Sequence, residues 1–270
     1  MGINQSKTFI SRLLETSNTL NLCAKEKECL DVGYDGLPTR KRAYSDYRKV
    51  ISESDIENKS ELLKVFSLTK DEKQEYNDDY RKKVYIKNGN LRCVYNYKQY
   101  IDKAISIIDN NSYADKVVGF AALTGRRVAE IATSADFKIK NSESLIFKGQ
   151  LKNKNGDVTS DYEIPCLYNT FNLIKKFDVF REEYKKYLGD PKKFNSNFSK
   201  YIGISTKKHF KEFVDCDVMA KDLRAIYGRI CCNLYKPDNE TESFYFAKIL
   251  GHSDLDLTTC NSYLCFRLVD

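Results

Sequence analysis

LTGRRVAEI, residues 123–131, is the stretch that decides the fold, because two arginines interrupt an apolar pattern there. An apolar helix is predicted over 114–123, Thr124–Gly125 forms a tight turn, and a new helix is predicted to begin at Arg126. Arg127 is therefore expected at a helix start. A single arginine in that position is usually a solvated side chain, so its meaning depends on the other charged residues that interrupt apolar elements.

Three later segments also contain charged residues that interrupt apolar elements. FKGQLKNKNG (147–156) contains the tip of a predicted β-hairpin, because its Asn-Gly pair favours a turn. AKDLRAIYGRI (220–230) opens a predicted helix, and ILGHSDLDLTTCNSYLCF (249–266) follows a helix that stops at Gly251. A last short helix is predicted around 257–266. The fold class is therefore α+β and mainly helical, with a small β-hairpin or sheet.

The composition of the 270-residue chain excludes several classes of protein. No apolar run approaches 18 residues and the start is polar, so we expect no membrane span, no secretory signal and a cytoplasmic protein. Nine cysteines without a CxxC pair, and only two histidines, predict reduced thiols and no metal site. We expect Cys93, Cys166 and Cys260 to be buried. The net charge of +7 permits a polyanionic partner such as nucleic acid.

Across these segments the order Arg, Lys, Lys-x-x-Arg, His, Tyr resembles the tyrosine recombinase and type IB topoisomerase superfamily. TGRR, FKGQLK and LGH…NSY together resemble the hairpin telomere resolvases, or protelomerases. Lys221 stands where a histidine is common in the superfamily, three residues before Arg224. The resemblance covers roughly 100–270. It implies a tyrosine-recombinase-like catalytic domain over 98–270. The preceding residues 1–97 match no motif of the family, and their pattern predicts a helical N-terminal DNA-clamping or linker region.

The resemblance implies a catalytic set consisting of Tyr263, Arg127, Lys152, Lys221, Arg224 and His252. Glu130 matches the acidic residue that follows the first arginine of the family. Lys152 is the expected general acid, with Lys148 and Lys154 as alternatives on or near the same hairpin tip. Forked guanidiniums suit the nonbridging oxygens of a phosphodiester, and tyrosine, with a reference pKa near 10, forms a 3′-phosphotyrosine intermediate.

Such a transesterification needs neither ATP nor metal, so no cofactor is expected, and the chain has no GxxxxGK[ST] loop. The expected partner is double-stranded DNA with an inverted-repeat telomere junction, bound by a homodimer at the nucleoid. Three alternatives stay open. They are a site-specific recombinase or integrase, a type IB topoisomerase, and a non-catalytic DNA-binding protein that keeps the fold.

Residues 40–49 interleave cations with aromatic side chains, which is typical of a nucleic-acid-binding surface. The candidate DNA-binding residues are Arg40, Lys41, Arg42, Tyr44, Arg48, Lys49 and, at the hairpin tip, Lys154. Tyr44 or Tyr47 would stack on bases. The alternative is a solvated helix face with two packed tyrosines. His209 is expected at the surface or facing DNA.

Overall fold

The computed structural model describes residues 2–151, 161–251 and 260–269, which form parts of two compact units, 1–83 and 84–270. The sequence-based division after residue 97 and the DNA-clamping role of the first region stay predictions. No helix in the described ranges is long and apolar enough to cross a membrane.

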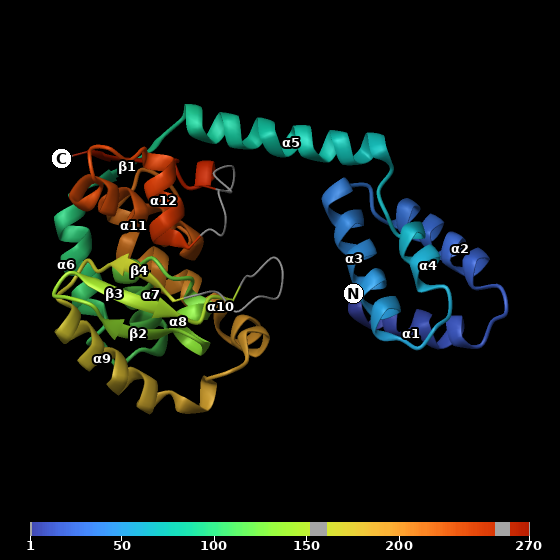
Figure 1. Cartoon of the computed structure of the whole chain (residues 1–270), viewed down its shortest axis with the longest axis horizontal. Coiled ribbons are helices and arrows are strands. Elements are labelled where there is room, and N and C mark those ends of the chain that lie inside the picture. Colours follow the sequence, from blue (N-terminus) through green and yellow to red (C-terminus); the bar gives the residue numbers. More distant parts are fainter. Residues whose placement is uncertain (1, 152–160, 252–259, 270) are drawn as a thin grey trace. The chain divides into compact units, whose positions relative to one another are not determined.

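The first unit is helical (Figure 1). Its helices are α1 (Gly2–Leu14), α2 (Thr19–Gly33), α3 (Leu37–Glu53), α4 (Lys59–Val65) and the first part of α5 (Lys70–Gly89), which continues into the second unit. An aromatic cluster lies at the centre: the Phe66 ring stacks on the Tyr47 ring with centroids 5.0 Å apart, and the Phe9 ring lies 5.2 Å from the Tyr47 ring.

Tyr44 and Tyr47 belong to this core, so the expectation that either stacks on bases is wrong. Each is only 1% exposed, because both lie on the inward face of α3 together with Ile51. Their hydroxyl groups donate to carboxylates of α2, Tyr44 to Asp31 and Tyr47 to Glu26. The basic residues of this stretch are therefore sorted onto the remaining faces of the helix.

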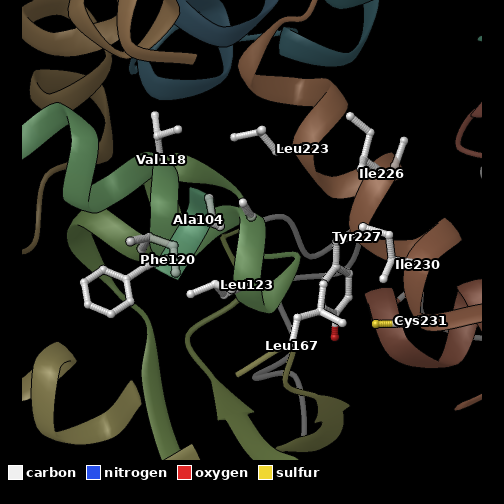
Figure 2. Packing of buried hydrophobic residues seen from close by; sticks show 14 of the residues in the cluster. Ala104, Val118, Phe120, Leu123, Leu167, Leu223, Ile226, Tyr227, Ile230 and Cys231 are labelled. Carbon is white, nitrogen blue, oxygen red and sulfur yellow. The ribbon is translucent and has the colours of Figure 1, made fainter. Parts of the chain in front are cut away.

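The second unit surrounds a buried central helix. Its helices are α6 (Tyr97–Ile107), α7 (Tyr113–Thr124), α8 (Val128–Thr133), α9 (Thr170–Glu183), α10 (Pro191–Phe210), α11 (Ala220–Tyr235) and α12 (Glu242–Leu250), with the 3-10 turns η1 (Lys185–Tyr187) and η2 (Lys211–Phe213). Every residue from Val117 to Thr124 is buried. Figure 2 shows Val118 and Leu123 of α7 in the same core as Leu223 and Tyr227 of α11.

Two large apolar side chains on the helices of this unit are exposed. Phe171 on α9 is 59% exposed and Leu234 near the end of α11 is 42% exposed. Leu173, Phe177 and Phe180 make the buried face of α9. Phe171 lies in the first turn of the helix, outside this face. Three cysteines expected to be buried, Cys93, Cys166 and Cys260, are buried, and all nine cysteines are free thiols.

The strands form two small sheets. β2 (Asp136–Ile139), β3 (Ser144–Lys148) and β4 (Tyr162–Pro165) are antiparallel in that order, which confirms the predicted hairpin, and α9 packs on β2. β1 (Arg92–Tyr95) pairs in parallel with β5 (Phe266–Val269), with Arg92 opposite Phe266. Of the helix expected around 257–266, residues 257–259 lie outside the described ranges. Among the described residues of this span only 260 and 261 are helical, and the chain enters β5 at Phe266.

Gly125 closes α7 with φ +66°, a backbone conformation that disfavours side chains. A methyl group at its Cα would also lie 2.1 Å from Cδ1 of Tyr227. The tight approach of α7 to α11 therefore depends on glycine at this turn, directly before the two arginines.

We predict that Gly125→Ala lowers the free energy of unfolding of the second unit by ~2 kcal/mol or more, because it adds left-handed strain to a steric overlap. Gly203→Ala is the matched control: Gly203 lies inside α10 with nothing near its Cα, so the change is expected to stabilise by ~0.5–1 kcal/mol. Urea unfolding measures both. Equal stability of Gly125→Ala and the parent chain contradicts this packing.

Candidate active site

A cavity of about 800 Å³ in the second unit brings together four of the side chains singled out in the sequence. Arg127, Lys221, Arg224 and Tyr263 all line it. Lys221 is exposed at the start of α11, while Tyr263 is partly buried just before β5. The other two members of the expected set, Lys152 and His252, lie outside the described residues, as does Lys154. Leu151, next to Lys152 in the chain, also lines the cavity.

Arg224 is the most deeply buried of these cations, with 3% exposure. Its Nη1 donates to the carbonyl of Gly125 at 2.7 Å and its Nη2 to the carbonyl of Leu250, while Nε has no hydrogen-bond partner within the described ranges. Burial, and then the neighbouring Arg126 and Arg127, lower the pKa of Arg224 to about 10, so it stays charged at neutral pH. A buried donor without a partner suits an anion that enters the cavity.

The guanidinium of Arg224 also faces the tyrosine. Its Cζ lies 5.9 Å from the centroid of the Tyr263 ring. The backbone N–H of Tyr263 donates to the carbonyl of Cys260 at 2.8 Å, which forms a turn before the strand. The phenol and the buried guanidinium thus meet at one wall of the cavity.

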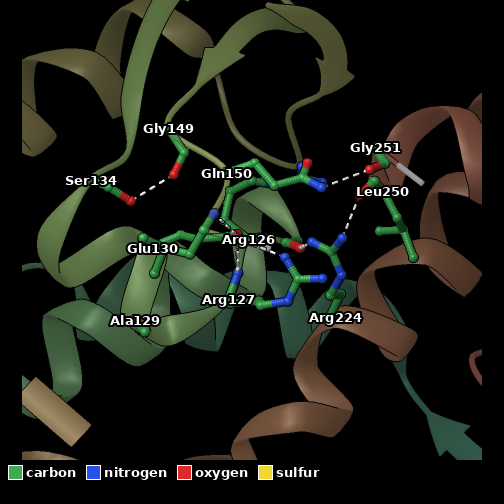
Figure 3. Close-up of polar contacts among 12 residues, drawn as sticks. Arg126, Arg127, Ala129, Glu130, Ser134, Gly149, Gln150, Arg224, Leu250 and Gly251 are labelled. Atoms are coloured by element: carbon green, nitrogen blue, oxygen red, sulfur yellow. Dashed lines mark hydrogen bonds and ion pairs between the residues drawn. The ribbon is translucent and has the colours of Figure 1, made fainter. Parts of the chain in front are cut away.

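Arg127 and Glu130 form a further part of the site, with Arg127 beside Arg224 (Figure 3). The backbone N–H of Arg127 donates to Glu130 Oε2 at 2.9 Å, which caps α8, and the Arg127 guanidinium pairs with Oε1. Glu130 is fully buried. Burial on its own would raise its pKa, but the charges of Arg224, Arg127 and Arg126 outweigh it and lower the pKa. For Arg127, burial on its own would lower the pKa, and Glu130 raises it overall.

Arg126 was not singled out in the sequence, yet it is 1% exposed and joins three segments. Its Nε donates to the carbonyl of Thr124 at 3.1 Å, its Nη2 donates to the carbonyl of Ile249 at 2.7 Å, and its Nη1 donates to the Tyr162 hydroxyl. Its guanidinium also lies 4.9 Å from the centroid of the Phe147 ring. Arg126 therefore holds the turn, the sheet and the end of α12 together.

The same network fixes the chain next to Lys152 and His252, the two expected catalytic residues that lie outside the described ranges. The Tyr162 hydroxyl donates to Gln150 Oε1, and Gln150 Nε2 donates to the carbonyl of Gly251, each at 2.8 Å. Gly251, with φ +62°, directly precedes His252, and Gln150 lies two residues before Lys152. Gln150 and Gly251, the residues next to the two segments that lie outside the described ranges, are thus held by the sheet and by the end of α12.

A second cluster of cations lies in the first unit. A groove of about 810 Å³ between α3 and α4 is lined by the cations Arg48, Lys49 and Lys64, the hydroxyl residues Ser45, Ser52, Ser60 and Ser67, and Leu63. The sequence singled out Arg48 and Lys49 but not Lys64 or the serines, because they come together only when the helices pack.

The remaining cations of residues 40–49 lie outside this groove. Arg40 pairs with Glu72 at 2.8 Å, and Lys41 Nζ lies 3.8 Å from the centroid of the Tyr76 ring. Arg42 is exposed. Two of the three therefore already have partners within the first unit.

His209 was expected at the surface or facing DNA, and this is wrong. It is buried on α10, with Nε2 3.2 Å from Asp115 Oδ1, which also accepts from the Ser205 hydroxyl at 2.6 Å. Packing of α10 on α7 explains the burial. Among the described residues, no group of histidine, cysteine, aspartate or glutamate side chains could hold a metal ion.

Comparison with known proteins gives a consistent result. A family model described as telomere resolvase ResT/TelK catalytic domain matches residues 90–266. Protelomerase of Yersinia phage PY54 is 28% identical over 176 residues, which are 59% of this chain and 28% of that protein. Protelomerase of Escherichia phage N15 is 25% identical over 60% of this chain and 30% of its own length. The chain thus spans less than a third of either curated relative.

Solved structures share the fold. Protelomerase TelA covalently complexed with substrate DNA has a TM-score of 0.87 and 24% identity, over 97% of this chain and 86% of that one. Protelomerase TelK complexed with substrate DNA has a TM-score of 0.64 and 21% identity, over the whole of this chain and 58% of that one.

We predict that Glu130→Gln lowers the free energy of unfolding at pH 7 by ~3 kcal/mol, because it leaves buried guanidiniums without their counter-charge. The folded pKa of Glu130 lies below its ordinary 4.5, so its contribution is full above that pH and is lost as the pH falls through the folded value. The deficit of the variant should therefore shrink below pH 4.5. Urea unfolding at pH 7 and pH 4 measures it.

Glu182→Gln is the control for this test, since Glu182 is exposed and its ion pair within the described ranges is with Lys185 at 3.4 Å. We expect it to change stability by less than ~0.5 kcal/mol at either pH. A Glu130→Gln deficit that is the same at pH 4 as at pH 7 contradicts the assigned charge.

Proposed function

Because the chain belongs to the telomere resolvase ResT/TelK catalytic domain family, we propose that it breaks DNA through a tyrosyl intermediate and reseals the ends as covalently closed hairpins. One observation carries the proposal: Tyr263, Arg127 and Arg224 line a single cavity, with the Arg224 guanidinium facing the phenol ring. A nucleophile and two permanent cations around one space are what phosphodiester exchange requires.

The first step is attack of the Tyr263 phenol oxygen on phosphorus. The new bond joins the tyrosine oxygen to phosphorus, the bond from phosphorus to the 5′-oxygen breaks, and the product is a 3′-phosphotyrosine with a free 5′-hydroxyl. Arg127 and Arg224 stabilise the charge that builds on the nonbridging oxygens. Lys221, exposed at the mouth of the same cavity, adds a further positive charge.

The leaving 5′-oxygen needs a proton. We propose Lys152 as its donor, with Lys148 and Lys154 as the alternatives, and His252 as a further donor to the phosphate. Gln150 and Gly251 support this assignment, since their hydrogen bond fixes the chain beside both residues. The freed 5′-hydroxyl then attacks the phosphotyrosine of the opposite strand, which restores the phenol and closes the hairpin.

The proposed substrate is double-stranded DNA with an inverted-repeat telomere junction, and each of two cleavages needs its own tyrosine. A homodimer on the DNA supplies them. A resolvase working on replicated DNA acts at the nucleoid in the cytoplasm. This activity belongs to whole resolvases, and the chain covers only 28–30% of the length of the two phage protelomerases compared above.

The first unit adds binding affinity in this proposal. Arg48, Lys49 and Lys64 line one groove with four hydroxyl groups. Basic and hydroxyl side chains are two of the kinds that commonly contact phosphates in protein–DNA complexes. These contacts carry no sequence information, so they would hold the duplex while residues of the second unit act on one phosphate.

We predict that the chain converts a labelled inverted-repeat duplex into hairpins and a transient protein–DNA adduct on denaturing gels. Tyr263→Phe should abolish the adduct, at least a ~10³-fold loss, while leaving DNA affinity nearly unchanged. Tyr201→Phe, which removes the same atom from an exposed tyrosine of α10, should behave as the parent chain.

Each other product identifies a different activity. Crossed-over strands would show a recombinase, and relaxed plasmid without hairpins would show a topoisomerase. Binding without an adduct would leave a DNA-binding protein. Undiminished adduct formation by Tyr263→Phe removes this tyrosine from the mechanism.

We predict that replacing Arg48 and Lys64 together by glutamine reduces the slope of log affinity against log salt by ~2, because each cation that contacts a phosphate releases about one counterion. Lys175 and Lys186, exposed cations that line neither the groove nor the cavity, are the matched double control. Fluorescence anisotropy across a salt series measures the slopes. Equal slopes for the two double variants contradict a DNA contact in the groove.

A further inference from the structure

Lys87 lies in the last turn of α5 and lines the cavity that contains Tyr263. Its ammonium donates to the backbone carbonyl of Ser262 at 2.7 Å. Neither the family motifs nor the charge pattern of the sequence singles it out. Within the described ranges no carboxylate pairs with it, and the carbonyl that it contacts belongs to the residue directly before the proposed nucleophile.

The contact fixes a particular peptide group. The carbonyl of Ser262 and the N–H of Tyr263 belong to one planar peptide unit. The N–H donates to the carbonyl of Cys260 at 2.8 Å, and the carbonyl accepts from Lys87. Both polar ends of the unit that carries the Tyr263 Cα are therefore held, and Lys87 is the only one of the two partners that comes from another part of the chain.

The far side of the turn is fixed by the same stretch of sequence. The Arg92 N–H donates to the carbonyl of Cys265 at 2.9 Å, and the Arg92 guanidinium lies 3.9 Å from the centroid of the Phe266 ring. Residues 87–92 thus contact the chain on both sides of Tyr263. The paired strands β1 and β5 hold the later side of the turn, and Lys87 holds a carbonyl on its earlier side.

From these contacts we infer that Lys87 is a positioning residue, which orients Tyr263 for attack by holding the peptide bond between Ser262 and Tyr263. The inference rests on the proposed function of Tyr263. An ammonium has three N–H donors, and only one is used by Ser262. Since α5 also carries the chain from the first unit into the second, the helix that joins the units takes part in presenting the nucleophile.

The test compares the single-turnover rate of adduct formation at saturating DNA with the DNA dissociation constant. For Lys87→Met we expect a ~10–100-fold lower rate, because a charge-assisted hydrogen bond is lost and the phenol is misplaced, with a dissociation constant changed less than ~3-fold. Lys87→Arg keeps a charged donor and should recover most of the rate. Lys83→Met is the control: it removes the same charge from α5, and its partner in the structure is Asp79.

Several outcomes overturn the inference. One is a Lys87→Met rate equal to that of Lys83→Met at saturating DNA. Another is a loss confined to the dissociation constant, since that would make Lys87 only a DNA contact. Equal losses in Lys87→Met and Lys87→Arg, with unchanged thermal unfolding, also exclude a donor role. If neither the parent chain nor Lys83→Met forms an adduct, the proposed function itself fails, and the inference falls with it.

Discussion

One buried carboxylate, Glu130, faces three guanidiniums, and the rest of the second unit depends on that imbalance. Arg126 donates to backbone carbonyls, and Arg127 forms the direct ion pair with Glu130. Arg224 retains a buried donor without a partner in the described ranges. Positive charge in excess of its counter-charge is costly in a protein interior. Packing keeps the cluster in place, and in the proposed function a DNA phosphate supplies the missing negative charge.

The packing that tolerates this charge is non-local. Gly125 lets α7 end against Tyr227 of α11, which places Arg127 and Arg224 on facing elements. The parallel pair of β1 and β5 then returns the end of the described chain to the same cavity. Apolar burial around α7 supplies the stabilisation. Rigidity here is useful for catalysis, since donors that need no rearrangement stabilise a transition state most effectively.

The sequence identified several residues that line the cavity, but fewer of the residues that hold them in place. Arg127, Arg224 and Tyr263 could be found because their order and spacing follow a family pattern, and the structure brings them together. Arg126 could not be separated from its neighbour by pattern alone, since only the fold shows which guanidinium is buried. The pairing of β1 with β5 was missed because each strand has four residues and their partners lie at opposite ends of the unit. Tyr44 was misjudged because its basic neighbours outweighed its helical spacing to Ile51, which indicates a buried face.

In the proposed mechanism this cavity directs the Tyr263 phenol to a DNA phosphate. The most direct measurement is mass spectrometry of the trapped adduct after nuclease and protease digestion. We expect the peptide that contains Tyr263 to carry the nucleotide mass, joined through a 3′-phosphate to the phenol oxygen. A nucleotide on any other residue, or a linkage through a 5′-phosphate, would contradict this mechanism.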